Sequence, residues 1–87
     1  MKLLFCPKCS DVFKLQKEMR SCVCGESKGK YLKDGIKATV LSGIPIGIDN
    51  GSFVRALGSR PKTGMGERFE AFVIPEVCLS INKEKEL

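Results

Sequence analysis

Two short cysteine pairs near the start of the chain restrict its fold more than any other feature of the sequence. The first is Cys6-Pro-Lys-Cys9, the second is Cys22-Val-Cys24, and twelve residues separate them. Cysteine pairs on two tight turns can bring four sulfur atoms to ~2.3 Å from one zinc ion without a large core to position them. The spacing therefore predicts a closed four-thiolate site at Cys6, Cys9, Cys22 and Cys24, which is the structural rather than the catalytic kind.

The length and the N-terminus indicate how these cysteines are used. The 87 residues are expected to form one domain with a small core, so that a bound metal would supply much of its stability. The stretch MKLLFCPKC lacks the apolar run of a secretion signal, which predicts a cytoplasmic location where thiols stay reduced. Five cysteines, an odd number, also favour a four-ligand site over a disulfide framework. Iron in the same cage and redox-active thiols are the alternatives to structural zinc.

Gly25, directly after Cys24, gives the backbone the freedom to turn its amides toward a thiolate. The one-residue spacer between Cys22 and Cys24 makes this a tight turn, which favours zinc over a rubredoxin-like iron site. Cys78 stands far from the other four, and we interpret it as a small buried hydrophobe. A reactive thiol is the alternative, although no His, Lys or Arg flanks it.

Residues 1–34 are expected to form a zinc ribbon, because the twelve residues between the cysteine pairs suit strands that enter and leave two tight turns. Asp34-Gly35 is a hairpin signal and predicts that residues 30–33 pair with residues 36–41. Residues 44–48 form a further short apolar strand, in which Pro45 indicates a sheet edge or a strand start.

A helix is expected to begin between Asp49 and Ser52 and to end at Gly58, with Phe53, Ala56 and Leu57 on one face. Strand character returns in RFEAFVIP and stops at Pro75. These patterns predict one α+β domain, an N-terminal zinc ribbon joined to a small antiparallel sheet with one short helix. Its parts are the ribbon (1–34), the antiparallel strands and helix (35–78) and a solvated tail (79–87).

The charge of the chain is concentrated in its first third. The formal net charge is +5, and four thiolates on a divalent zinc would lower it to about +3. Residues 1–34 hold eight basic against four acidic residues, whereas residues 35–87 hold seven against six. The basic residues are either a solvated face or a surface that binds nucleic acid or a partner protein, with Phe5, Phe13 and Tyr31 as candidate stacking groups. These basic residues are Lys8, Lys14, Lys17, Arg20, Lys28, Lys30 and Lys33.

A glycine-rich basic loop covers residues 58–68. It is not a Walker A motif, since the Gly-Lys-Ser/Thr ending is missing and no long helix follows. Its simplest interpretation is a solvated connection, and the alternative is a site that presents amides and cations to a phosphate or nucleotide. The side chains of that alternative site are Ser59, Arg60, Lys62, Thr63 and Arg68.

Three functions follow from these features, none of them enzymatic. The chain has no histidine and no nucleophile motif, so we expect no catalytic residues. The leading hypothesis is a binding module that docks on a protein or nucleic acid through the lysine-bearing face. The alternatives are a binder of a small anion at the glycine-rich loop, and self-association through the apolar segments IPIGI and FEAFVIP. No membrane contact is expected, because the apolar run IKATVLSGIPIGI is interrupted and too short to span.

With its cysteine pairs and the segments GKYLKDG, IPIGIDNGSFVRAL and ERFEAFVIP, the chain resembles small zinc-ribbon proteins encoded in bacterial and phage genomes, most of them without an assigned activity. The resemblance extends through about Pro75. It implies a zinc site at the four N-terminal cysteines and no settled activity. In zinc ribbons generally, the ribbon binds nucleic acid or docks on a larger protein assembly.

Overall fold

The computed structural model describes residues 1–75, 78 and 81–83. Within them the chain forms short strands and a single helix, an α+β arrangement as predicted. In chain order the elements are β1 (Lys2–Phe5), β2 (Val12–Lys14), β3 (Arg20–Ser21), β4 (Lys28–Tyr31), β5 (Ala38–Ser42), β6 (Ile44–Ile48), α1 (Asn50–Gly58), β7 (Ala71–Val73) and β8 (Ile81–Lys83).

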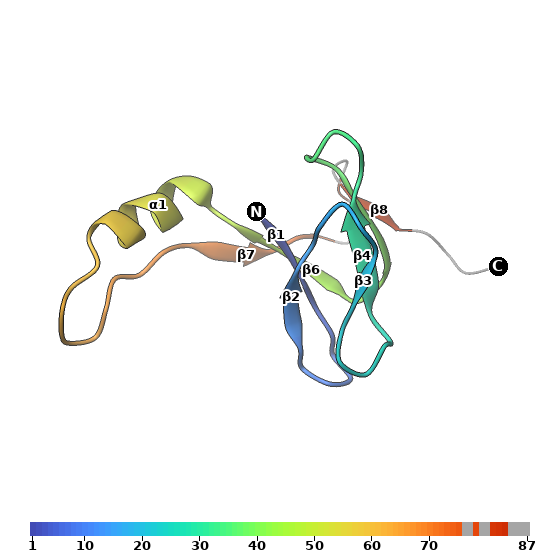
Figure 1. The fold of residues 1–87 in the computed structure, drawn as a ribbon, viewed down its shortest axis with the longest axis horizontal. Coiled ribbons are helices and arrows are strands. Elements are labelled where there is room, and N and C mark those ends of the chain that lie inside the picture. The colour runs from blue at the N-terminus through green and yellow to red at the C-terminus, as the bar shows by residue number, and fades with distance from the viewer. Residues whose placement is uncertain (76–77, 79–80, 84–87) are drawn as a thin grey trace.

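The strands form two four-stranded sheets, with orders β2-β1-β6-β7 and β3-β4-β5-β8 (Figure 1). The chain passes from one sheet to the other at Gly43, the single residue between β5 and β6. Gly43 has φ +109°, a region that side chains disfavour, and an added Cβ would lie 3.0 Å from Leu4 Cγ. The strands that follow the predicted ribbon, β5 to β8, therefore lie in the same two sheets as the ribbon strands β1 to β4. The pairing is antiparallel, as predicted, except between β5 and β8, which are parallel; β8 lies in the segment that was predicted to be a tail.

The hydrophobic core lies where the two sheets face each other. Gly29 of β4 packs so closely that a Cβ would lie 3.0 Å from Leu15 Cδ2 and 3.4 Å from Leu4 Cδ2. The Tyr31 hydroxyl accepts a 2.7 Å hydrogen bond from the Lys2 backbone N–H and so ties β4 to β1. The buried hydrophobic residues of this core are Leu4, Cys6, Phe13, Leu15, Cys22, Ala38, Val40, Ile74 and Ile81.

The predicted Asp34-Gly35 turn connects β4 and β5, which pair from Tyr31↔Ala38 onward. Gly35 has φ +70°, and the Asp34 carboxylate accepts 2.9 Å hydrogen bonds from the N–H groups of residues 36 and 37. The pKa of Asp34 is lowered, first by the hydrogen bond from Ile36 and then by that from Lys37.

Two expectations about the middle of the chain were wrong in part. β6 lies inside its sheet, between β1 and β7, and Pro45 is its second residue, so only the strand-start interpretation of this proline holds. In α1 the buried residues are Ser52 and Ala56, while Leu57 is 59% exposed. The cause is that α1 lies on no sheet and has only the returning chain against it.

Residues 49–70, called the arm below, extend away from the two sheets (Figure 1). They comprise α1 and the chain that leads back to β7. The principal extents of the molecule are 50 × 28 × 22 Å and its radius of gyration is 14.4 Å, above the ~12 Å expected for a compact chain of this length. Neither α1 nor any other helix among the described residues is long and apolar enough to cross a membrane.

The C-terminal part is more ordered than the predicted tail. Residues 81–83 form β8, and Ile81 is buried because it packs beside β5. Cys78 is half-buried and packs against the core, in agreement with its interpretation as a small hydrophobe. The remainder of the predicted tail, 79–80 and 84–87, lies outside the described residues.

Candidate metal centre and lysine-bearing face

The first cysteine pair lies on the turn between β1 and β2. The Cys6 N–H donates to the Asp11 carbonyl at 2.9 Å, and the Ser10 N–H donates to the Cys6 carbonyl at 2.7 Å. Ser10, directly after Cys9, has φ +63°, the only positive φ of a non-glycine residue in the described chain. This turn therefore holds a residue with a side chain in the left-handed region that glycine prefers.

The second pair lies on the turn between β3 and β4, which repeats the same plan. The Cys22 N–H donates to the Ser27 carbonyl at 2.9 Å, and the Gly25 N–H donates to the Cys22 carbonyl at 3.1 Å. Gly25, directly after Cys24, has φ +82°. The expectation that this turn needs the backbone freedom of glycine is confirmed.

The two turns bring the four sulfur atoms together, all within 4.8 Å of one another. Cys24 Sγ lies 3.7 Å from Cys6 Sγ and 3.4 Å from Cys22 Sγ. Four ligands at ~2.3 Å from a tetrahedral ion have their sulfur atoms about 3.8 Å apart, whereas a disulfide needs about 2.05 Å. The distances thus suit four ligands of one ion and no disulfide, so Cys6, Cys9, Cys22 and Cys24 could hold a metal ion.

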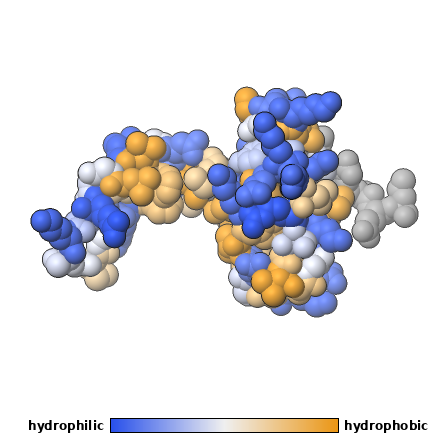
Figure 2. Space-filling view, viewed as in Figure 1, coloured by the Kyte–Doolittle hydropathy of each residue, from blue (hydrophilic) through white to orange (hydrophobic). Residues whose placement is uncertain are grey.

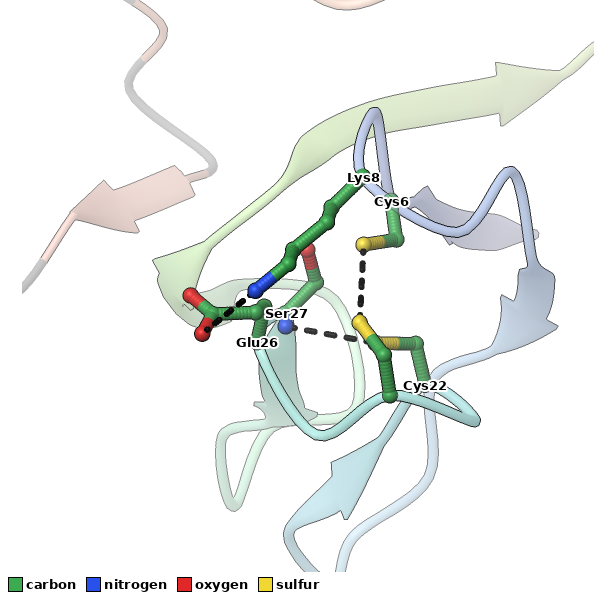
Figure 3. A network of polar contacts seen from close by, with 6 residues as sticks. Cys6, Lys8, Cys22, Glu26 and Ser27 are labelled. Atoms are coloured by element: carbon green, nitrogen blue, oxygen red, sulfur yellow. Dashed lines mark hydrogen bonds and ion pairs between the residues drawn. The ribbon is translucent and has the colours of Figure 1, made fainter.

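The surroundings of the sulfurs join the two turns to each other (Figure 3). The Ser27 N–H donates to Cys22 Sγ at 3.3 Å. The Asp11 carboxylate of the first turn accepts a 3.0 Å hydrogen bond from the Val23 N–H of the second. Lys8 Nζ lies 3.4 Å from Glu26 Oε1 across the same gap, and both side chains are exposed. Asp11 is a positioning residue that the sequence analysis missed, because nothing in its local pattern reveals a partner twelve residues away.

Without a cation the four thiols do not all ionise readily. The Ser27 side chain is the main cause that lowers the pKa of Cys6 to about 6. At Cys24 a hydrogen bond from the Glu26 backbone lowers the pKa, but desolvation and the three neighbouring thiols outweigh it and raise the pKa to about 12. A divalent cation would reverse this balance, since it stabilises all four thiolates.

The predicted lysine-bearing face divides into three parts. Lys17, Lys30 and Lys33 line one cleft of about 370 Å³ together with Tyr31 and Leu32, at the end of β4 that lies away from the cysteines. Lys14, Arg20 and Lys28 are exposed on β2, β3 and β4, and Lys8 is paired with Glu26 at the cysteine cluster. Hydrophilic surface gathers over the upper part of the body in Figure 2.

The aromatic side chains proposed for stacking are occupied elsewhere. Phe13 is buried in the core, with the Arg20 guanidinium 5.8 Å from its ring centroid. Arg20 also donates a 2.9 Å hydrogen bond to the Lys14 carbonyl. Tyr31 and Phe5 are half-buried, and the Tyr31 hydroxyl is already bonded to the backbone of β1. A platform of exposed aromatic rings is therefore not formed by these three residues.

The glycine-rich loop contributes to a second cleft, of about 580 Å³, between α1 and the chain that returns to β7. Ser59 and Arg68 line this cleft, whereas Arg60, Lys62 and Thr63 do not. The cleft also contains residues outside the predicted set, and these carry both signs of charge. Its full lining is Ser52, Arg55, Ala56, Ser59, Glu67, Arg68, Phe69 and Glu70.

Fold and site together define a small α+β protein with a four-cysteine cluster able to hold a metal ion. No protein-family model, curated protein or solved structure matches this chain.

Proposed function

We propose that this protein is a non-catalytic binding module, built as a zinc ribbon around one structural zinc ion, that docks on an anionic partner through its lysine-bearing face. Of the two partner classes, nucleic acid suits the face better than an acidic protein. Its three candidate stacking rings are buried or half-buried, so the face offers an external partner mainly positive charge, which is what phosphate backbones require.

The observation that carries this proposal is the different use of acidic and basic groups in residues 1–34. Three of the four carboxylates are engaged: Asp11 with a backbone amide, Glu26 with Lys8, and Asp34 with two backbone amides. In contrast, Lys17, Lys30 and Lys33 share a cleft and form no salt bridge with any described residue. The positive charge at this end of β4 is therefore left available to an external anion.

Zinc is the ion that suits the cluster best. Four thiolates are soft ligands, and a closed set of four with no water position is the usual arrangement of structural zinc. The donors come from two turns of similar geometry, which hold the ends of both sheets together. When bound, the ion would neutralise part of the thiolate charge and keep the turns in place. Mass spectrometry of the intact protein under non-denaturing conditions tests the proposal, and one zinc per chain is the expected result.

The docking proposal is tested by charge reversal of the cleft lysines. Lys17→Glu, Lys30→Glu and Lys33→Glu together should weaken binding to labelled single-stranded and duplex oligonucleotides, measured by fluorescence anisotropy at several salt concentrations. Three phosphate contacts correspond to a change of about 2.7 in the slope of log affinity against log salt for duplex DNA. The slope should therefore become flatter in the triple variant.

A matched control carries the same change in net charge on the arm, with Arg60→Glu, Lys62→Glu and Arg68→Glu. If binding depends on the cleft lysines, this control keeps most of the affinity. Equal losses in both variants would show only a response to net charge, and no binding to any oligonucleotide would direct attention to acidic proteins as the partner.

The arm cleft supports the alternative function, capture of a small anion. Ser59 and Arg68 lie in one cleft with Arg55, which the sequence analysis did not include. Glu67 and Glu70 line the same cleft and would oppose a phosphate unless the arginines dominate. A thermal-shift screen of nucleotides distinguishes this function, since a ligand at 100 times its dissociation constant stabilises the protein by ~2.7 kcal/mol. Loss of such a shift in Arg55→Ala and Arg68→Ala would assign the ligand to this cleft.

A further inference from the structure

Strand β7 has an open edge in the described structure. It is the last strand of its sheet, pairs with β6 on one side and has no described strand on the other (Figure 1). All three of its residues, Ala71, Phe72 and Val73, are exposed. An exposed apolar edge strand is a template for another strand, and proteins usually cover or charge such edges.

The pairing of β7 with β6 determines which backbone groups of β7 point toward the open edge. The Ile74 N–H donates to the Pro45 carbonyl, and the Glu70 N–H and C=O are bonded to Ser52 Oγ and to the Asp49 N–H. Residues 70 and 74 thus direct their backbone groups inward. Because backbone groups alternate along a strand, those of residues 69, 71 and 73 point away from β6.

We propose that two copies of the chain pair through β7, antiparallel and centred on Ala71. In this register residue 71 lies opposite residue 71 of the second copy, and residue 69 lies opposite residue 73. The outward groups of all three residues then pair in one continuous ladder. Each Phe69 lies opposite a Val73, and such aromatic with β-branched pairs stabilise antiparallel sheets. The small side chain of Ala71 allows close approach at the two-fold axis.

The arm and β7 together supply the apolar area that such a dimer needs. Exposed fractions are 64% for Val54, 59% for Leu57, 43% for Phe69, 55% for Phe72 and 67% for Val73. Figure 2 shows hydrophobic surface along the arm. With ~150–250 Å² for a large side chain, these five leave on the order of 500 Å² per copy. Two copies offer about 1,000 Å², at the lower limit for a specific interface, so the dimer should dissociate on dilution.

A second copy of the chain fits this surface better than a nucleic acid does. The strand edge requires a partner that offers backbone donors and acceptors, which a nucleic acid does not. The arm also lacks support of its own: α1 has nine residues, below the ~12–15 at which isolated helices become stable. It contacts the return segment through the Phe53–Phe69 edge contact, with centroids 4.8 Å apart. Hydrogen bonds of Asp49 and Ser52 with Glu70 add to this contact. Dimerisation would fix Phe69 and hence α1. The cleft lysines lie on the other sheet, so this dimer is independent of the docking function.

Sedimentation velocity over a wide range of concentrations tests the association. The zinc-loaded protein should pass from monomer to dimer, and Ala71→Lys should raise the dimer dissociation constant at least about tenfold, because two like charges meet at the axis. The control is Val12→Lys, on the exposed edge strand at the other side of the same sheet, which should leave the constant unchanged. A protein that stays monomeric at every concentration would overturn the proposal.

The register is tested by cysteine cross-linking in a Cys78→Ser background. Opposed residues of a hydrogen-bonded antiparallel pair have Cα atoms about 5.5 Å apart, within the ~4.4–6.8 Å that a disulfide spans. Under mild oxidation, zinc-loaded Ala71→Cys should therefore form a covalent dimer, faster than Val12→Cys. A dimer that forms without faster cross-linking at position 71 would reject this interface and require another.

Discussion

If the four cysteines hold the proposed zinc, its removal should unfold the two-sheet body, because structural zinc contributes at least as much free energy as the net stability of a domain of this size. A domain of 87 residues has a net stability of roughly 4–13 kcal/mol, at ~0.05–0.15 kcal/mol per residue. Structural zinc in small domains contributes an apparent ~10–16 kcal/mol. Two of the four candidate ligands, Cys6 and Cys22, belong to the buried core. Without an ion, the two turns would be joined, among the described residues, by little more than the Asp11–Val23 hydrogen bond and the exposed Lys8–Glu26 pair.

The assay compares thermal unfolding of the zinc-loaded protein with that of protein stripped by a strong chelator, monitored by far-ultraviolet circular dichroism. The stripped protein should show no cooperative transition, and zinc should restore one. A stripped protein whose melting temperature lies within a few degrees of the loaded value would refute this reasoning.

Substitution of a single cysteine measures how much one ligand contributes to zinc affinity. Cys24→Ser removes one of the four proposed ligands, and an equal share of the binding energy is about 2.5–4 kcal/mol, or roughly 60- to 1,000-fold in zinc affinity. Cys78→Ser is the matched control, since Cys78 is the one cysteine outside the cluster. Competition with a chromogenic chelator measures both affinities. Equal values for the two variants would exclude Cys24 as a ligand.

Three further predictions concern stability. Ser10→Gly should stabilise the loaded protein by about 0.5–1 kcal/mol in urea unfolding, because it relieves a left-handed φ of +63° at the cost of some chain entropy; a loss of stability would contradict this. Gly29→Ala should destabilise it by ~1–3 kcal/mol, since the new Cβ would lie 3.1 Å from the Thr39 carbonyl oxygen; a neutral result would show that β4 can shift. Stability of the loaded protein should fall as the pH decreases below the ordinary thiol pKa of ~8.5, because the unfolded cysteines bind protons that zinc-bound thiolates do not. The upper limit is four protons, at about 1.4 kcal/mol each per pH unit, and a flat profile between neutral pH and pH 6 would exclude thiolate ligation.

The cysteine cluster and the hairpin turn could be predicted because each depends on local chemistry. Gly25 and the Asp34-Gly35 turn require particular backbone angles, and these requirements are visible in a few consecutive residues. The position of β6 could not be predicted, since Pro45, which has no N–H, fits this inner strand at its start, where the chain that follows β7 donates to the Pro45 carbonyl and needs no donor from it. The inward face of α1 was predicted correctly at Phe53 and Ala56 and wrongly at Leu57, because the periodicity of these residues assumes a sheet beneath the helix and only the returning chain lies there.

Which lysines are paired and which are available to a partner could not be predicted from the sequence either. Seven basic residues within one segment look equivalent in the sequence, but only tertiary pairing separates Lys8, which is bound to Glu26, from the three lysines that share a cleft. Likewise, the exposed Phe72 appears as a core residue in an apolar pattern, until the strand that carries it proves to be the outermost of its sheet.

The cysteine cluster and the arm have different roles in this small chain: the cluster stabilises the two sheets, and the arm exposes apolar surface. The cluster fixes the ends of short strands, which alone bury too little surface to be stable. The arm buries only Ser52 and Ala56 of its helix and leaves its larger apolar groups outside. A domain that needed those groups for its own core would fold the arm back over a sheet. Since the body already has a core and, in the zinc-loaded form that we propose, a metal to hold it, the apolar groups of the arm and the edge of β7 remain available for the proposed pairing with a second copy.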